Sequence, residues 1–120
     1  METGIDIVEV ERVKKAVLNN QNFLTKYFTQ NEITYFNQKG ENKYQSIAAN
    51  FAGKEAFSKA LRTGIRGFSL KEVEILRDNL GAPYINLFGK AKEISKGKRF
   101  SISLSHTKEN AIAICIAMEG

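Results

Sequence analysis

Phe51-Ala-Gly-Lys-Glu-Ala-Phe-Ser-Lys-Ala60 is the stretch of this 120-residue chain that decides its fold. It lies inside the longest helical pattern of the sequence, which runs from about Glu41 to Leu61. Small and aromatic residues recur at helical spacing on one side of this pattern: Ile47, Ala48, Phe51, Ala52 and Ala56. Two glycines in the segment 63–67 end the pattern. We therefore expect one long, mostly buried helix in the middle of the chain.

Shorter patterns on both sides of this helix indicate the rest of the architecture. Before it we expect a strand over 3–8, a helix from 9 to about 18, a short aromatic helix or turn around 23–28, and a helix that a Thr29/Glu32 capping box begins and that ends near 38. After it we expect a bulged strand over 68–77, strands over 84–88, 100–104 and 110–118, and a short helix around 90–95. Early helices and late antiparallel strands predict an α+β fold, in which the early helices pack on a small antiparallel sheet. No repeat or linker interrupts the chain, so residues 1–120 are expected to form a single domain.

The composition favours an anionic partner, because the chain carries a net charge of +5 and has a pI near 9.4. Nucleic acid, a phosphorylated cofactor and an acidic protein all fit that charge. No apolar run approaches the roughly 20 residues that cross a bilayer, so no membrane partner is expected. The single cysteine, Cys115, lies in an apolar run and is interpreted as a buried structural thiol. Such cysteine usage fits a reducing compartment and predicts a cytoplasmic location.

The first of three segments that carry chemically useful side chains is Gly4-Ile-Asp-Ile-Val-Glu-Val-Glu-Arg12. Asp6 stands between two isoleucines on a predicted strand, so alternation places its carboxylate on the face opposite its neighbours. A carboxylate on an apolar strand is costly unless it is paired or bound to a metal. Taken alone, an aspartate at a strand end that faces water or caps the next helix explains Asp6 at least as well.

In the second segment, Glu55 and Lys59 are four residues apart and share one face of the long helix. An exposed ion pair worth about 0.3–0.5 kcal/mol is the ordinary explanation. Against it, the surrounding phenylalanines and alanines leave few positions for a solvated face. A carboxylate and an ammonium on one face suit a metal–diphosphate site, in which the carboxylate takes a hard cation and the lysine offsets phosphoryl charge.

The third segment, Ser101-Ile-Ser-Leu-Ser-His-Thr107, alternates as a half-buried strand does and contains the only histidine. Its three serines fall on one side, with His106 at the strand end. A hydrolase is not indicated, because the chain has no Gly-x-Ser-x-Gly elbow and no suitable Ser-His-acid order. A lone histidine beside a turn is more often structural than catalytic, but its hydroxyl neighbours could bind phosphate.

In this order and spacing, the three segments resemble the holo-acyl-carrier-protein synthase family, the small class of 4′-phosphopantetheinyl transferases. The resemblance covers nearly the whole chain: Gly-x-Asp-Ile-x-Glu-x-x-Arg, Phe-Ala-x-Lys-Glu-Ala-Phe-Ser-Lys-Ala followed by Thr-Gly, Gly-x-Pro-Tyr-Ile at 81–85, and Ser-x-Ser-His-Thr. It implies an enzyme that transfers 4′-phosphopantetheine from coenzyme A to a serine of apo acyl carrier protein, releases adenosine 3′,5′-bisphosphate and supports fatty acid biosynthesis. The nucleophile then comes from the carrier, which explains why this chain shows no activated serine or cysteine.

The resemblance also implies roles for the three charged residues. Asp6 and Glu55 would ligate Mg²⁺ against the diphosphate of coenzyme A. Glu55, directly or through a water on the metal, would be the base for the carrier serine. Lys59 would stabilise negative charge on the diphosphate as it breaks.

Further contacts to coenzyme A are expected from residues elsewhere in the chain. The third segment and the backbone near Gly64 would contact the phosphates or the ribose, through Ser105, His106 and Thr107 in particular. Lys39 and Lys43, in the loop before the long helix, are candidates for the 3′-phosphate.

The basic residues of the first helix are the expected partner-binding residues. Family resemblance makes this helix the docking face for the acidic recognition helix of acyl carrier protein, through Arg12, Lys14 and Lys15. A solvated charged face explains Lys14 and Lys15 about as well, so docking is favoured mainly for Arg12. Small members of the family are trimers with active sites between subunits, and we expect a homotrimer here too.

The chain departs from the family pattern at two places. Asn50 stands where the family usually carries arginine, and we expect this change to weaken the cofactor phosphate contacts or to move them to Lys39 or Lys43. The family also tends to have a longer first strand with another glycine before Gly4, whereas this chain begins Met-Glu-Thr, so the strand is short or the start is altered.

Two rival interpretations fit less of the sequence. A basic nucleic-acid-binding module would interleave basic residues with exposed aromatics on a sheet, whereas the late strands carry serine and isoleucine. A non-catalytic interaction subunit would have no need of the intact Asp6, Glu55 and Lys59.

Overall fold

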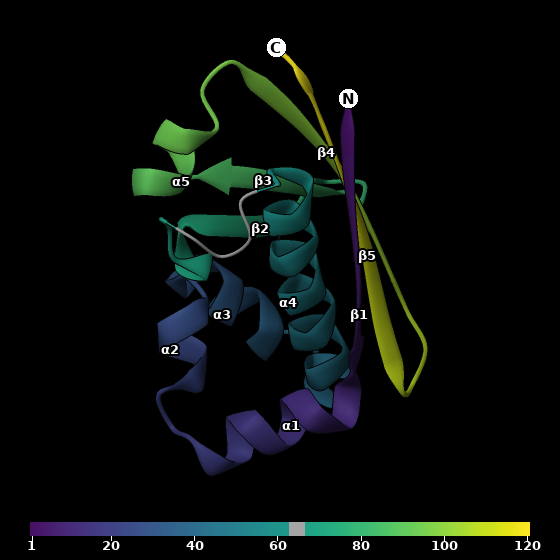
Figure 1. The fold of residues 1–120 in the computed structure, drawn as a ribbon. Coiled ribbons are helices and arrows are strands. Elements are labelled where there is room, and N and C mark those ends of the chain that lie inside the picture. The colour runs from purple at the N-terminus through teal and green to yellow at the C-terminus, as the bar shows by residue number, and fades with distance from the viewer. Residues whose placement is uncertain (63–66) are drawn as a thin grey trace.

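The structure, a computed structural model, describes residues 1–62 and 67–120 (Figure 1). Its elements, in chain order, are β1 (Glu2–Glu9), α1 (Val10–Asn19), α2 (Phe23–Tyr27), α3 (Gln30–Asn37), the 3-10 helix η1 (Gly40–Asn42), α4 (Lys43–Ala60), the 3-10 helix η2 (Leu70–Glu72), β2 (Val73–Arg77), β3 (Pro83–Leu87), α5 (Gly89–Ile94), β4 (Lys98–His106) and β5 (Asn110–Glu119).

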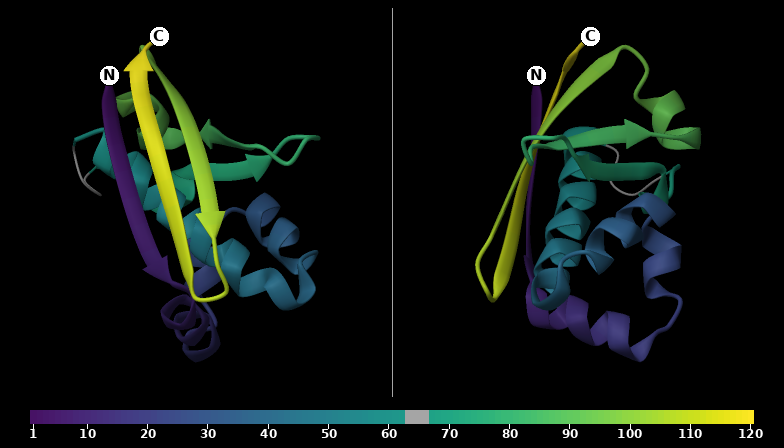
Figure 2. Two further views of the ribbon diagram at one scale, coloured as in Figure 1. Left: turned by 90° about the vertical axis from the view of Figure 1, so that its right-hand side faces the viewer. Right: turned by 180° about the vertical axis from the view of Figure 1, so that it is seen from behind.

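The strands form two antiparallel sheets. β5 lies between β1 and β4 in a three-stranded sheet, while β2 and β3 pair separately. The left view of Figure 2 looks onto the three-stranded sheet, and the described helices lie behind it, against the opposite face. Along β5, alanines and Cys115 are buried toward the helices, while the isoleucines between them face outward. The helices therefore cover one face of this sheet, and we call the other the bare face.

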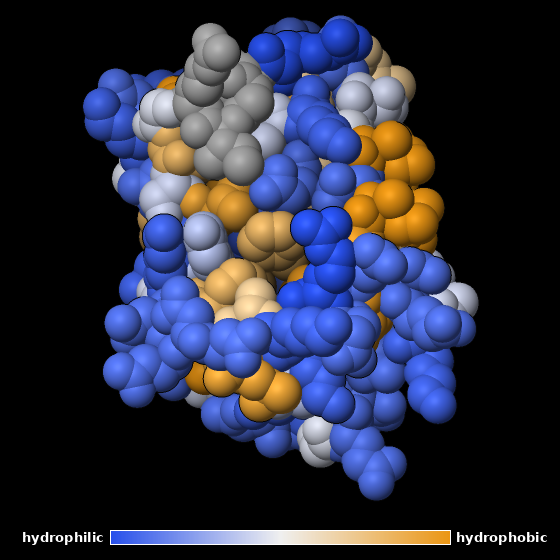
Figure 3. All heavy atoms as spheres, turned by 60° about the horizontal axis from the view of Figure 1, so that its bottom comes forward, coloured by the Kyte–Doolittle hydropathy of each residue, from blue (hydrophilic) through white to orange (hydrophobic). Residues whose placement is uncertain are grey.

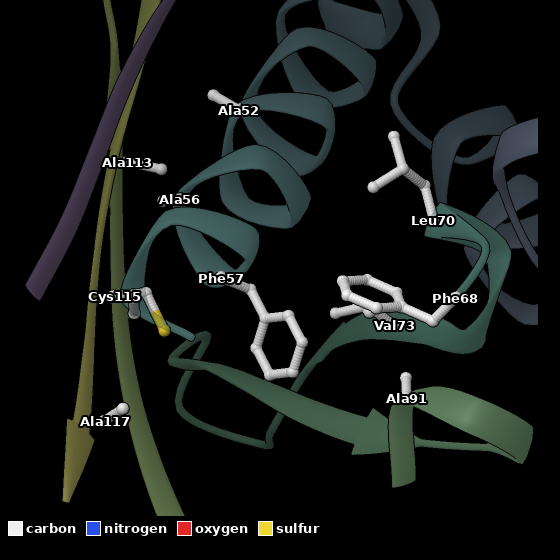
Figure 4. Packing of buried hydrophobic residues seen from close by; sticks show 11 residues of the cluster. Ala52, Ala56, Phe57, Phe68, Leu70, Val73, Ala91, Ala113, Cys115 and Ala117 are labelled. Atoms are coloured by element: carbon white, nitrogen blue, oxygen red, sulfur yellow. The ribbon is translucent and has the colours of Figure 1, made fainter. Parts of the chain in front are cut away.

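Helix α4 packs against both β1 and β5 because its inward side is made of small residues. Ala52 and Ala56 lie toward Ala113 and Cys115 of β5, whereas Phe57 points the other way, toward Val73 and Phe68 (Figure 4). A Cβ atom at Gly53 would lie only 2.6 Å from the Cδ1 atom of Ile75, so the glycine lets β2 side chains reach the helix backbone. Small side chains thus keep α4 close to the sheet for its whole length.

A second apolar cluster joins α1 and α3 to the first half of α4. Phe28 and Phe36 are fully buried in it and meet edge to face, with ring centroids 5.1 Å apart. Val10 and Val13 of α1 belong to the same cluster and lie at the helical spacing that the sequence predicts. This cluster holds the early helices against the end of α4 that is farthest from Lys59.

The structure confirms the α+β class and the Thr29/Glu32 capping box. The expected bulged strand over 68–77 is wrong in its first half. Ser69 caps the 3-10 helix η2, and the side chain of Glu72 accepts hydrogen bonds from the amides of Ser69 and Ala91, so β2 begins only at Val73. Among the described helices, none is long and apolar enough to span a membrane.

Candidate active site

Asp6 lies in the middle of β1, on the face of the sheet that α4 covers. Its neighbours Ile5 and Ile7 are 57% and 66% exposed on the bare face, so the predicted alternation is confirmed. Gly4 permits a close contact between β1 and α4, because a Cβ atom there would overlap the carbonyl oxygen of Ala56 and lie 2.6 Å from the amide nitrogen of Ala60. The strand therefore passes directly against the last turns of α4.

Lys59 and Glu55 meet Asp6 at this contact between strand and helix. The Nζ atom of Lys59 lies 3.2 Å from Oδ1 of Asp6 and donates a 2.9 Å hydrogen bond to the carbonyl oxygen of Ile5. Burial and, next, the negative charge of Asp6 raise the pKa of Glu55, while the charge of Lys59 opposes this shift. Two carboxylates that repel one another thus share one nearby ammonium group.

This pair of carboxylates fits a Mg²⁺ ion that also binds phosphate. Protein Mg²⁺ sites typically use one or two carboxylates, several waters and the phosphates of the substrate. A divalent cation would relieve the repulsion between the two carboxylates, which adds to burial in raising the pKa of Glu55. Within residues 1–62 and 67–120, no three His, Cys, Asp or Glu side chains gather as metal ligands. Water and phosphate oxygens would therefore supply the remaining ligands.

A hollow of about 390 Å³ opens beside Glu55, and we call it the Glu55 hollow. Aromatic residues of α2 and α4 form one wall and the segment that leads into η2 forms another; the lining residues are Phe23, Lys26, Tyr27, Phe51, Glu55, Ser69 and Leu70. The rings of Tyr27 and Phe51 meet edge to face at 5.9 Å. The hollow can therefore receive a substrate group next to the carboxylate of Glu55.

A second hollow of about 500 Å³, the α1 groove, shares Phe23 and Phe51 with the Glu55 hollow. Residues of α1 and β1 form most of its lining; the full set is Ile7, Val8, Glu9, Arg12, Val13, Ala16, Phe23, Phe51 and Asn110. Figure 3 brings the α1 end of the molecule forward and shows apolar side chains uncovered among polar ones in the middle of this face. An apolar groove that also contains Arg12 suits an acidic amphipathic helix.

A third hollow of about 520 Å³, the His106 hollow, lies at the other end of α4. Its lining combines η1 and the first turn of α4 with the end of β4 and the turn that follows it: Glu41, Asn42, Gln45, His106, Thr107 and Lys108. Oγ1 of Thr107 shapes that turn, because it accepts a 3.1 Å hydrogen bond from the amide of Asn110. Gln45 precedes Glu55 by ten residues on α4, so at 1.5 Å per residue this hollow lies about 15 Å from Glu55 along the helix.

The other predicted cofactor contacts do not gather in the His106 hollow. Ser105 lies on the bare face of the sheet, where it lines a separate small hollow with Ile5 and Ser103. Lys39 lies over the ring of Tyr35, 4.8 Å from its centroid, and Lys43 lies 5.9 Å from the ring centroid of Tyr44. Gly64 lies outside the described residues.

The predicted partner-binding residues of α1 do not all lie at one site. Arg12 lines the α1 groove, whereas Lys14 lies over the ring of Tyr44, 5.5 Å from its centroid. Lys15 is exposed and is absent from the lining of the groove. Of the three, Arg12 is therefore the residue best placed to contact a partner in the groove.

The expectation for Asn50 is wrong, because this residue is fully buried. Its amide donates to Oε2 of Glu32 and to the carbonyl oxygen of Ile75, each at 3.0 Å, and its Oδ1 accepts a 2.9 Å hydrogen bond from Arg77. Position 50 thus faces the interior and cannot contact a cofactor phosphate. Arg77 of β2 brings a guanidinium to this place from another element.

Comparison with known proteins decides the family. A sequence profile described as the 4′-phosphopantetheinyl transferase superfamily matches residues 2–115. The chain belongs to this family. Among curated members, the holo-[acyl-carrier-protein] synthase of Clostridium perfringens (strain ATCC 13124) is 50% identical over 124 residues, covering 98% of this chain and 92% of the relative. That of Thermoanaerobacter sp. (strain X514) is 53% identical over 120 residues, with coverages of 98% and 86%.

Solved structures of the family agree with the fold. The Helicobacter pylori holo-[acyl-carrier-protein] synthase in complex with coenzyme A superposes with a TM-score of 0.84 at 34% identity, covering 96% of this chain and 98% of that chain. The Bacillus anthracis holo-(acyl-carrier-protein) synthase in complex with CoA (3′,5′-ADP) gives 0.85 at 30% identity, with coverages of 99% and 96%. The family resemblance and the fold class expected from the sequence are both confirmed.

Sequence reasoning missed several residues that line these hollows in the transferase. Lys108 follows the Ser-x-Ser-His-Thr motif directly, and this adjacency is a signal that could have found it. Asn42 and Gln45 precede the long motif by nine and six residues and carry no such signal. The sequence predicts Phe23 only as part of a short aromatic helix or turn, although it lines both the α1 groove and the Glu55 hollow.

Proposed function

We propose that this transferase moves 4′-phosphopantetheine from coenzyme A to a serine of apo acyl carrier protein and thereby supports fatty acid biosynthesis in the cytoplasm, with residues 1–120 acting as one domain. The convergence of Asp6, Glu55 and Lys59 carries this proposal. Curated relatives about 50% identical to the chain are named for the same reaction. The single cysteine is no candidate nucleophile, because burial raises the pKa of the Cys115 thiol to about 12.

The three charged residues divide the chemistry between them. Asp6 and Glu55 would hold Mg²⁺, which supplies positive charge to the diphosphate. Glu55 accepts the proton of the carrier serine, directly or through a water. The serine oxygen bonds to the phosphorus that carries pantetheine, and the bond from that phosphorus to the bridging oxygen breaks. Lys59 stabilises the negative charge that remains on the departing adenosine 3′,5′-bisphosphate.

The α1 groove is the proposed docking site for the carrier. It contains Arg12, has an apolar lining and continues through Phe23 and Phe51 into the Glu55 hollow. An acidic amphipathic helix would bury its apolar side in the groove and pair its carboxylates with Arg12. The carrier serine would then enter the Glu55 hollow.

The distance along α4 supports a nucleotide site shared between subunits. The 3′-phosphate and the diphosphate of coenzyme A are attached to the same ribose, so the groups that bind them must lie close together. In one chain the His106 hollow is about 15 Å from Glu55. A neighbouring copy would bring its own His106, Thr107 and Lys108 to the diphosphate at Asp6 and Glu55.

The bare face of the three-stranded sheet is the proposed contact between these copies. Four isoleucines of β1 and β5 are exposed on it by 39–66%: Ile5, Ile7, Ile112 and Ile114. In Figure 3, apolar atoms gather at the right-hand edge of the view, on the side where the sheet lies. A contiguous apolar patch of this kind marks an interaction surface. A homotrimer would bury it and place Ser105 beside a neighbouring subunit.

Transfer is tested by incubating the purified protein with Mg²⁺, coenzyme A and several apo acyl carrier proteins, followed by intact-protein mass spectrometry. We expect one phosphopantetheine mass on each accepted carrier. Absence of a mass shift on every carrier would contradict the proposal. Tight, salt-sensitive binding to RNA or DNA without any transfer would instead support a nucleic-acid-binding module.

A further inference from the structure

Lys54, the residue immediately before Glu55, is fully buried together with its ammonium group. Its Nζ atom donates three hydrogen bonds: to Oε1 of Glu32 at 2.8 Å, to the carbonyl oxygen of Leu70 at 3.0 Å and to that of Val73 at 2.6 Å. An ammonium group has three protons, so every donor has an acceptor. The ring of Phe28 covers the group, with its centroid 4.9 Å from Nζ.

Glu32 is held as firmly as the lysine it binds. Its two carboxylate oxygens also accept hydrogen bonds from the backbone amides of Thr29 and Ile75 and from the side chain of Asn50. The carboxylate therefore connects the start of α3, the middle of α4 and β2. Lys54 is anchored by this network and has no freedom to leave its two carbonyl acceptors.

The hydrogen bonds from Lys54 to its two carbonyl acceptors fix the position of one wall of the Glu55 hollow. Leu70 and its neighbour Ser69 line the hollow together with Glu55, and Leu70 is one of the two residues whose carbonyls Lys54 holds. Val73, the other, begins β2 directly after η2. Lys54 and Glu55 are consecutive residues of α4, so Lys54 fixes the η2 segment to the helix at the level of Glu55.

We propose that Lys54 is a positioning residue: by holding Leu70 and Val73 it sets the width of the Glu55 hollow and so its fit to the serine-bearing segment of the carrier. The proposal rests on the proposed function, which assigns this hollow to the carrier serine. It assigns Lys54 no contact with substrate.

A purely structural role for Lys54 predicts a different effect on activity when the residue is replaced. Replacing a buried ion pair with apolar groups is often neutral for stability, whereas removing one partner is strongly destabilising. If Lys54 served stability alone, its loss would lower activity only in proportion to the unfolded fraction. If it positions the wall, the folded variant is itself impaired toward the carrier.

The test compares Lys54→Met with Asn50→Ala. Both changes remove a buried polar side chain of α4 from the Glu32 network, but Asn50 binds Ile75 and not the η2 segment. Steady-state transfer is measured at a temperature where circular dichroism shows both variants folded. We expect Lys54→Met to raise the KM for apo acyl carrier protein by about tenfold or more, with the KM for coenzyme A within about twofold of the parent. Asn50→Ala should leave both KM values near those of the parent.

A folded Lys54→Met protein with the parent KM for the carrier would overturn the proposal, as would an equal KM change in Asn50→Ala. Should Lys54→Met not fold, Lys54→Gln is measured in the same way, and we expect the same KM change in smaller measure. Failure of both Lys54 variants to fold would also overturn the proposal, since the lysine would then be required by the fold itself. Failure of the proposed function is recognised separately, because the parent protein would then transfer nothing.

Discussion

Nζ of Lys59 and Oδ1 of Asp6 lie 3.2 Å apart, although 53 positions separate the two residues in the sequence. The contact exists because Gly4 lets β1 pass directly against the backbone of α4 at Ala56 and Ala60. The glycine two residues before Asp6 thus creates the place where the two carboxylates and the ammonium meet.

Gly4→Ala is expected to destabilise the protein by about 1–3 kcal/mol, because the new methyl group would overlap the carbonyl oxygen of Ala56. Urea denaturation measures this change. Transfer by the folded variant should also fall, since the strand can accommodate the methyl group only by moving away from Lys59. Asn79→Ala, in the exposed turn between β2 and β3, is the control and should change neither property. Unaltered stability in Gly4→Ala would show that the contact is looser than described.

Glu55→Gln is expected to raise the melting temperature in the absence of metal. Burial and the charge of Asp6 raise the pKa of Glu55 in the folded state, so the ionised form is less favourable there than in the unfolded chain. Its contribution to stability therefore falls as the pH rises from about 4.5 through the raised pKa, and at pH 7 the neutral glutamine removes that cost.

Mg²⁺ should reverse this order of stability. It should raise the melting temperature of the parent protein, because it binds the folded state, and have little effect on Glu55→Gln. Glu2→Gln, which alters an exposed carboxylate paired with Arg62, should respond to Mg²⁺ as the parent does. Equal stabilisation of all three proteins would contradict the assignment of Glu55 as a ligand.

Arg12→Ala is expected to raise the KM for apo acyl carrier protein roughly tenfold and to leave the KM for coenzyme A unaltered, because Arg12 lines the α1 groove. Added salt should weaken carrier binding by the parent more than by the variant. Lys15→Ala, on the same helix but outside the groove, should have a much smaller effect. Similar KM values for both variants would indicate that general electrostatic attraction, and not docking in the groove, draws the carrier to the enzyme.

Ile114→Asp is expected to convert the proposed trimer into monomers and to abolish transfer, because Ile114 lies on the bare face, is 39% exposed in one chain and is absent from the lining of the α1 groove. Size-exclusion chromatography with light scattering measures the mass. Leu80→Asp is the matched control, since Leu80 is 95% exposed in the turn between β2 and β3 and lies on neither the sheet nor α4. Active monomers of Ile114→Asp would disprove a site shared between subunits.

Local patterns were sufficient for most of the secondary structure and for the orientation of Asp6. The strands and helices that the sequence predicts agree with the structure to within two residues at nearly every boundary, and Ile5 and Ile7 flank Asp6 on the opposite face as alternation requires. The capping box was predictable because both of its hydrogen bonds join Thr29 to Glu32, three residues apart.

Long-range hydrogen bonds account for what local patterns could not predict. One exception is η2, which shortens the expected strand over 68–77: it begins at a local capping box between Ser69 and Glu72, and Glu72 also accepts from Ala91, 19 residues away. Lys54 binds Glu32 across 22 positions, and Asn50 binds Ile75 across 25. Helical periodicity assigns lysine and asparagine to a polar face, and nothing in the local sequence shows that partners from α3 and β2 will satisfy them in the interior.

The position of a metal ion tests the central claim, that Asp6 and Glu55 together hold the cation at the diphosphate, most directly. Crystals grown with coenzyme A and Mn²⁺ in place of Mg²⁺ would reveal the ion by its anomalous scattering. The account predicts a peak within about 2.5 Å of a carboxylate oxygen of Asp6 and of Glu55, and next to the diphosphate. A peak that contacts the diphosphate but neither carboxylate, or one bound elsewhere on the protein, would contradict it.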